Sequence, residues 1–205
     1  ATGIKYLSEE KNFDYVIVMD GDGEDRPEEI KLLTDKALEL QKKNISIVAR
    51  RVKRSEGLIF TVLYNLHKLI TLIFTGQNMN FGHYCCLTRD DVLLISSKKS
   101  LWCNFSSTVK KFTKKLDSIP CIRGKRYVQP SKMSFVNLII HSFSILAVFK
   151  YQVLIRSVLF ILVLFFIMPY FLGAVLQSII IIFTVLVFII SRRESSEELA
   201  NCKSK

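Results

Sequence analysis

The chain reads YVIVMDGDGEDRP over residues 15–27. Its first five residues are largely apolar and three of them are β-branched, which predicts a buried strand over residues 15–19. Four carboxylates then occupy six positions, and Pro27 followed by Glu28 and Glu29 is typical of the first turn of a helix. A strand, an acidic turn and a helix in succession predict the start of a layered α/β fold.

Strand and helix patterns alternate through the rest of the first 133 residues. Periodicity and turn residues predict, in chain order, a helix at 1–11, a helix at 27–43, a strand at 45–49, a helix at 58–75, a strand at 83–88, a helix at 89–96 and one or two strands at 120–128. We therefore expect residues 1–133 to form one α/β domain.

A long apolar run follows the domain, and residues 157–190 carry no charge in 34 positions. As one helix this run would reach roughly 51 Å, well beyond the ~30 Å hydrocarbon core of a bilayer. Pro169 and Gly173 lie at its middle, where a chain reversal needs such residues. We expect a hairpin of two transmembrane helices within residues 151–191, at about 154–170 and 174–190. A single long kinked helix is the alternative.

Basic residues flank this apolar run. Arg156 lies at its start, and Arg192 and Arg193 follow its end. By the positive-inside rule both ends face the cytoplasm. We therefore expect an integral protein of the inner, cytoplasmic membrane, with the domain in the cytoplasm and residues 192–205 as a cytoplasmic tail. Apolar residues at helical spacing predict an interfacial amphipathic helix over residues 134–150, with an ordinary core helix as the alternative.

The net charge of +11 is unevenly distributed. Residues 1–44 carry 7 basic and 11 acidic side chains, whereas residues 98–132 carry 10 basic and one acidic side chain. The basic residues crowd beside the apolar run and match no nucleic-acid-binding module, so we expect no nucleic-acid partner. The five cysteines form no CxxC pair, so we expect no zinc site. His67, His83 and His141 have no metal-ligand spacing, and we expect them to be structural.

The acidic turn is the candidate metal site. Crowded carboxylates repel one another unless a cation neutralises them, and hard oxygen ligands suit Mg²⁺ or Mn²⁺. Asp20 and Asp22 are the predicted ligands, because they directly follow a buried strand and ligands of α/β sheets bind at the carboxyl ends of strands. An EF-hand loop does not fit, because its sixth position is Asp25 and its twelfth is Lys31. A structural turn in which Asp25 caps the next helix is the alternative.

The segment from residue 13 to residue 30 resembles the Asp-x-Asp segment of family 2 glycosyltransferases with the GT-A fold. It is most similar to the branch that includes dolichol-phosphate mannose synthases and bacterial polyprenyl-phosphate glycosyltransferases. That branch has the pattern Asp-x-Asp-x-x-Asp-x-Pro-Glu, which Asp20, Asp22, Asp25, Pro27 and Glu28 match.

Three further stretches resemble the same branch. They are NFGHYCCLT at residues 80–88, RGKRY at residues 123–127 and SKMSF at residues 131–135. Members of the family also begin with a strand, an Asn-Glu turn and a nucleotide-binding Asp, and this sequence contains none of these features. We therefore expect the sequence to be truncated at its N-terminus, and we expect these 205 residues alone to be inactive.

The resemblance implies a partial GT-A, Rossmann-like nucleotide-sugar domain and an inverting, metal-dependent glycosyltransferase. The donor would be a nucleotide-sugar and the acceptor a polyprenyl phosphate or another lipid. Asp20, Asp22 and Asp25 would be the catalytic carboxylates, and Asp20 and Asp22 would hold Mg²⁺ or Mn²⁺. A phosphate monoester is largely ionised near neutral pH, with a second pKa of about 6, so it needs little help from a protein base.

Basic residues supply candidate ligands for the donor or acceptor phosphates, because arginine and lysine bind phosphate oxygens. The candidates are Arg50, Arg51, Arg54, Arg123, Arg126 and Lys132. A basic cluster beside a membrane span also attracts anionic lipid headgroups. The second interpretation is therefore a non-catalytic, membrane-anchored protein with a basic, lipid-binding juxtamembrane region.

Overall fold

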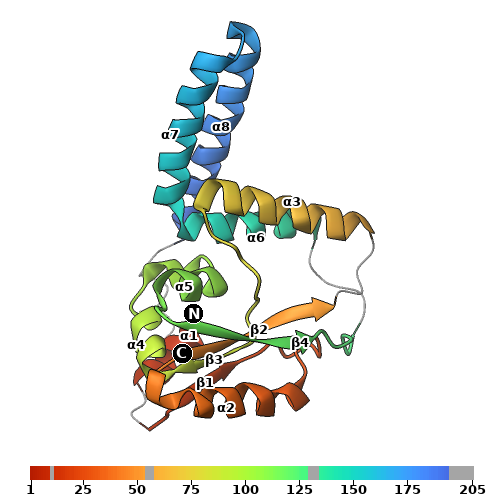
Figure 1. The fold of residues 1–205 in the computed structure, drawn as a ribbon, viewed down its shortest axis with the longest axis vertical. Helices are drawn as coiled ribbons and strands as arrows, with labels where there is room; N and C mark the ends of the chain where they lie inside the picture. The colour runs from red at the N-terminus through yellow and green to blue at the C-terminus, as the bar shows by residue number, and fades with distance from the viewer. Residues whose placement is uncertain (10–11, 54–57, 129–133, 194–205) are drawn as a thin grey trace.

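The computed structural model describes residues 1–9, 12–53, 58–128 and 134–193, without the side chains of residues 51, 53 and 58–61. Strands and helices alternate up to residue 122, and only helices follow, which confirms the α/β class (Figure 1). In chain order the elements are α1 (Thr2–Glu9), β1 (Tyr15–Val18), the 3₁₀ turn Pro27–Glu29, α2 (Ile30–Glu39), the 3₁₀ turn Gln41–Lys43, β2 (Ser46–Lys53), α3 (Leu58–Thr75), β3 (Cys85–Thr88), α4 (Arg89–Ser96), the 3₁₀ turn Lys99–Trp102, α5 (Phe105–Phe112), β4 (Leu116–Ile122), α6 (Phe135–Val148), α7 (Lys150–Ile167) and α8 (Tyr170–Ser191).

The described strands form a four-stranded mixed sheet in the order β1-β3-β2-β4. β3 is antiparallel to both of its neighbours, and β2 pairs with β4 in parallel. β1, β2 and β4 therefore run in the same direction. Their carboxyl ends, together with the start of β3, lie at one edge of the sheet.

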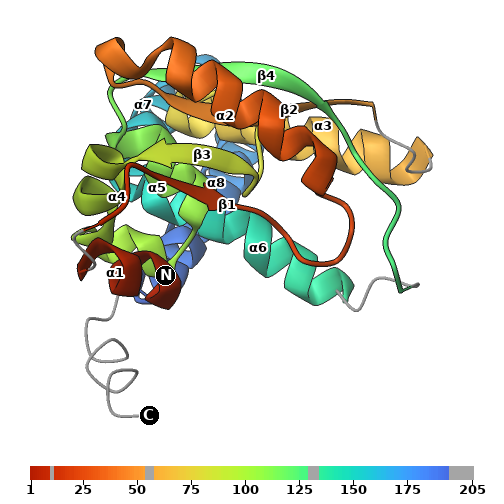
Figure 2. The ribbon, with the colours of Figure 1, turned by 90° about the horizontal axis from the view of Figure 1, so that it is seen from below.

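Helices cover both faces of this sheet (Figure 2). On one face α2 packs through Leu33 and Ala37 against Ile47 and Cys86. On the other face α1, α4 and α5 form a second apolar cluster, which includes Ile4, Val92, Ile95 and Val109 together with Cys85 and Leu87 of β3. Cys85 and Leu87 thus enter one cluster and Cys86 enters the other, and all four residues of β3 are buried. This explains why the first three residues of the strand are apolar, while Thr88 at its end caps α4 by accepting from the Asp91 amide.

α3 leaves the α/β layers although its residues lie within the predicted domain of residues 1–133. It packs against α6 and α7, and it crosses the direction of the apolar hairpin (Figure 1). Its Phe74 ring lies 5.5 Å from the Phe160 ring of α7 and 4.6 Å from the Phe183 ring of α8, between centroids. A helix that is apolar by sequence therefore finds its partners at the base of the hairpin.

α7 and α8 form the predicted antiparallel hairpin, and both are long and apolar enough to cross a membrane. Their 18 and 22 residues correspond to ~27 and ~33 Å of helix, close to the ~30 Å of a hydrocarbon core. The chain reverses at Met168 and Pro169, whereas Gly173 lies within the first turns of α8 rather than in the turn. Between the helices, the Thr184 hydroxyl donates to the Ser157 hydroxyl at 2.8 Å.

α6 confirms the helix predicted between the domain and the hairpin, and Ser134 caps its N-terminus by accepting from the Asn137 amide at 3.2 Å. Its first turns expose Phe135, Val136 and Ile139. Its last turn is buried against α5 and α8. The helix thus combines an exposed apolar start with a buried end.

Candidate functional site

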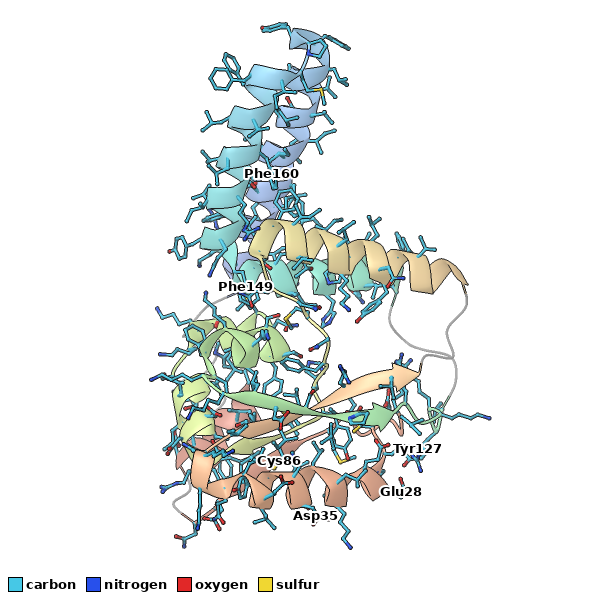
Figure 3. The ribbon with its side chains drawn as sticks, viewed as in Figure 1. Glu28, Asp35, Cys86, Tyr127, Phe149 and Phe160 are labelled. Atoms are coloured by element: carbon cyan, nitrogen blue, oxygen red, sulfur yellow. The ribbon has the colours of Figure 1, made fainter. Side chains whose placement is uncertain are left out.

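The acidic turn lies at the edge of the sheet where β1, β2 and β4 end. Strand direction explains this convergence, because segments that follow parallel strands meet at the same edge. The turn after β1 contacts the segment of residues 123–128, which follows β4. In Figure 3 the labelled side chains of Glu28 and Tyr127 mark this edge of the sheet.

Two glycines allow the backbones of these segments to touch. The Gly124 amide donates to the Glu24 carbonyl at 2.9 Å, and the Tyr127 amide donates to the Asp22 carbonyl at 2.9 Å. A Cβ added at Gly124 would lie 2.3 Å from the Gly23 carbonyl oxygen. Gly23 itself has φ +91°, a conformation that favours glycine. The acidic turn and the basic segment therefore form one unit.

Within this unit the arginines pair with the carboxylates. Arg123 contacts the Glu24 carboxylate, and the Arg126 Nε lies 2.7 Å from Glu24 Oε1 and 3.1 Å from Asp22 Oδ2. Both arginines had been predicted to bind phosphate. The structure places them beside the carboxylates, so positive charge of the chain itself already offsets part of the negative charge of the turn.

Asp25 is the buried member of the acidic turn. Its side chain is 2% exposed, and its Oδ2 accepts from the Asp20 amide at 2.9 Å. The helical turn that follows begins at Arg26 and has no side-chain cap. The capping role considered for Asp25 is therefore wrong, and the carboxylate instead holds the backbone of the turn that carries Asp20.

His83 lies beside Asp20 of the acidic turn and beside Phe105 of α5. His83 Nδ1 lies 3.4 Å from Asp20 Oδ1, and its ring centroid lies 5.8 Å from that of Phe105. Burial lowers the pKa of His141 in α6, the charge of His83 lowers it further, and Asp20 acts in the opposite direction. Burial and then His141 lower the pKa of His67 in α3.

His83 thus lies beside Asp20, and the charges of the three histidines act in a series, His83 on His141 and His141 on His67. Sequence analysis missed this series because residues 67, 83 and 141 are far apart in the chain. The position of His83 just before β3 could have predicted its contact with Asp20. β3 runs antiparallel to β1 and begins where β1 ends, so the residues before β3 lie near those after β1.

Asp20 and Asp22 remain accessible, with side chains 42% and 44% exposed. Asp22 Oδ1 accepts from the Glu24 amide at 3.0 Å, which orients the carboxylate. Among the described residues, no three His, Cys, Asp or Glu side chains are grouped closely enough to hold a metal ion. Two exposed carboxylates fit a Mg²⁺ or Mn²⁺ ion that takes its other ligands from phosphate and water, and do not fit an ion held by protein alone.

The other predicted phosphate ligands are only partly described. Arg50 is exposed near the end of β2, in register with Pro120 of β4. The side chain of Arg51 and the whole of Arg54 and Lys132 lie outside the described part of the chain. Comparison of the chain with protein-family models, curated proteins and solved structures found no match, so function has to be inferred from the side chains at this edge.

Proposed function

We propose that the protein is a membrane-bound glycosyltransferase of family 2, with a GT-A-type domain that moves a sugar from a nucleotide-sugar to a polyprenyl phosphate. One observation carries the proposal. The accessible carboxylates of Asp20 and Asp22 lie beside His83 and Arg126 at the edge of the sheet where β1, β2 and β4 end, and the charge of Asp20 acts to raise the pKa of His141 in α6, the helix that leads to the apolar hairpin. A donor held at this turn would be close to a lipid acceptor.

The residues of the turn have separable roles in this proposal. Asp25 fixes the backbone of the turn through the Asp20 amide, and the Glu24 amide orients Asp22. Mg²⁺ or Mn²⁺, when bound at Asp20 and Asp22, would neutralise charge on the donor diphosphate. Arg126 lies within 3.1 Å of Asp22, so its guanidinium is close enough to share a phosphate oxygen with that site.

The acceptor chemistry demands little of the chain. The phosphate monoester is largely ionised at neutral pH and attacks as it is, so no general base has to be assigned. The role of the chain is to bring the acceptor phosphate and the donor together, which can supply a large part of a rate enhancement. The basic residues at both ends of the hairpin favour the cytoplasmic side for this edge.

The test uses the protein purified in detergent. Mn²⁺ or Mg²⁺ is added with each of several uridine- and guanosine-diphosphate sugars, and the thermal midpoint is recorded. We expect one nucleotide-sugar to raise the midpoint only when metal is present, because a ligand that binds the native state stabilises it. Asp22→Ala should abolish this protection, whereas Asp35→Ala, on an exposed position of α2, should retain it. An unchanged midpoint with every donor, or equal protection of the Asp22 variant, contradicts the proposal.

A second candidate is a non-catalytic, membrane-anchored protein with a basic lipid-binding region. The pairing of Arg123 and Arg126 with Glu24 and Asp22 favours it, because the acidic turn is then balanced without any ligand. Transfer of labelled sugar to a short polyprenyl phosphate in detergent separates the two. The second candidate predicts no transfer by the wild type, and the first predicts transfer that is lost in Asp22→Ala.

A further inference from the structure

We propose that α3 is an in-plane membrane helix, whose outward face lies in the phospholipid leaflet beside the hairpin. The proposal does not depend on glycosyl transfer. The outward face is a contiguous row of exposed apolar side chains at helical spacing. They are Val62, Leu66, Leu69 and Ile73, which are 64%, 50%, 52% and 39% exposed. Their separations of four, three and four residues place them on one side of the helix.

The opposite side of α3 is occupied. Thr71 and Thr75 are buried, and Phe74 packs against rings of α7 and α8. Ile70 joins the apolar cluster formed by Leu146 of α6, Val153 of α7 and Val187 of α8. Because the inner side already has its partners, the apolar outer side requires an environment of its own. Soluble proteins rarely leave such a contiguous apolar surface in water.

Arg156 sets the depth of α3 relative to the hairpin. Its Nη1 donates to the Ile73 carbonyl at 3.0 Å, at the C-terminal end of α3. Gly76 ends the helix with φ +74°, and a Cβ there would lie 2.6 Å from Arg156 Nη2. Arg156 is six residues after Lys150, where α7 begins, so this contact lies about 9 Å along the helix from its N-terminal end. That depth is within the ~5–10 Å by which the apolar face of an interfacial helix enters the bilayer.

The occupant is a lipid leaflet rather than a protein for two reasons. First, the outer face of α3 continues into the exposed apolar surface of α7, and side chains project from α3 on the side from which α7 and α8 extend (Figure 3). Second, α3 carries Lys68 and the first turns of α7 carry Lys150 and Arg156, and their positive charge suits anionic headgroups. An in-plane α3 and α6 would together hold the acidic turn at a fixed distance below the bilayer.

The test measures depth with a single tryptophan. Trp102 is the only tryptophan of the chain, so Trp102→Phe provides a silent background for Leu69→Trp on α3. Leu162→Trp marks the exposed apolar surface in the second half of α7, and Leu38→Trp marks the exposed surface of α2. Each protein is reconstituted into phosphatidylcholine–phosphatidylglycerol vesicles that carry nitroxide-labelled lipid, with the nitroxide either close to the headgroup or near the chain end.

We expect Leu69→Trp to be quenched roughly threefold more strongly by the shallow nitroxide than by the deep one, as for an interfacial helix. Leu162→Trp should show the reverse order, which verifies insertion, and Leu38→Trp should be quenched by neither. Leu66→Trp, on the same face of α3, provides the reading if Leu69→Trp does not fold.

Two results would overturn the proposal. Quenching at positions 66 and 69 no stronger than at position 38 places α3 in water or against another protein. In that case, a dimer in detergent that Leu69→Glu dissociates would identify a second copy as the partner. Quenching strongest with the deep nitroxide would make α3 an inserted segment instead of an in-plane helix.

Discussion

At the scale of single residues, the acidic turn depends on a close contact between two glycines of different segments. Gly23 and Gly124 bring the backbone after β1 against the backbone after β4, with the Gly124 amide bonded to Glu24. This contact puts Arg126 within reach of Asp22. Any side chain at Gly124 has to separate the two segments, and the charge pairing would be lost with them.

Gly124→Ala should therefore destabilise the protein, whereas Gly21→Ala should not. A Cβ at position 124 would lie 2.3 Å from a backbone oxygen, while a Cβ at position 21 would meet nothing within 4 Å. Overpacking of this kind costs about 1–3 kcal/mol of unfolding free energy. The thermal midpoint in detergent measures the difference, and equal midpoints for the two variants would show that the segments do not pack as described.

Burial makes the thiols of the sheet unreactive. It raises the pKa of Cys86 to about 11 and that of Cys121 to about 12, and it raises the pKa of Cys85 as well. At pH 8 the thiolate fraction of Cys86 is then roughly 10⁻³. We expect iodoacetamide at pH 8 to leave these cysteines unmodified in the folded protein, and to modify them after denaturation. Peptide mass mapping measures this, and rapid native labelling of Cys86 would mean that β3 is not buried.

At the scale of secondary-structure elements, α3 is the helix whose environment differs most from expectation. Its apolar residues are visible in the sequence, but its partners are not, because they come from α6 and α7 more than sixty residues later. The strands behave differently, since each strand carries its own signal. Residues 15–19 predict β1 from their composition, and β3 lies within its predicted range, whereas β4 shares only residues 120–122 with the predicted range of 120–128.

Arg156→Leu tests the attachment of α3 to α7. The guanidinium donates to the carbonyl of Ile73, so its removal leaves the end of α3 without that bond. A hydrogen bond from a charged donor contributes about 1.5–3 kcal/mol, so amides of residues 72–76 should exchange at least about tenfold faster. Arg192→Leu, at the end of α8, is the matched control. Unchanged exchange in the Arg156 variant would mean that packing alone holds α3.

At the scale of the whole molecule, the α/β layers and the apolar hairpin are joined through α5 and α6. The Lys111 ammonium donates to the Val148 carbonyl at 2.5 Å and lies over the Phe149 ring at 5.8 Å from its centroid. Val148 and Phe149 are almost fully buried. The junction between α6 and α7 is therefore tied to the last turn of α5, which fixes the sheet beneath the hairpin.

Lys111→Met should weaken this junction, whereas Lys110→Met should have little effect. Methionine keeps the apolar stem of lysine but cannot donate to Val148, and the loss is expected to cost about 1–2 kcal/mol. Proteolysis under native conditions reports on the junction, because the chain at Val148 and Phe149, which is buried in the folded protein, becomes accessible when the contact opens. Equal cleavage of the two variants would place the connection between the layers elsewhere.

The order of the elements, the acidic turn and the apolar hairpin could be read from the sequence, because each depends on neighbours within one turn or strand. Residues 15–27 predict a strand, a carboxylate cluster and a helix, and the uncharged run of residues 157–190 predicts apolar helices in the C-terminal part. Even so, the chain reverses at Met168 and Pro169, and Gly173 lies inside α8.

Which of these residues contact one another depends on tertiary packing. The pairing of Arg126 with Asp22, the contact of His83 with Asp20 and the docking of α3 on α7 join residues that are dozens of positions apart. The mixed sheet brings the carboxyl ends of β1 and β4 to one edge. The sequence of neither strand indicates in which direction it runs relative to the other. Local patterns determine elements because they depend on backbone geometry, whereas a site forms when non-local packing lowers the free energy of the whole chain.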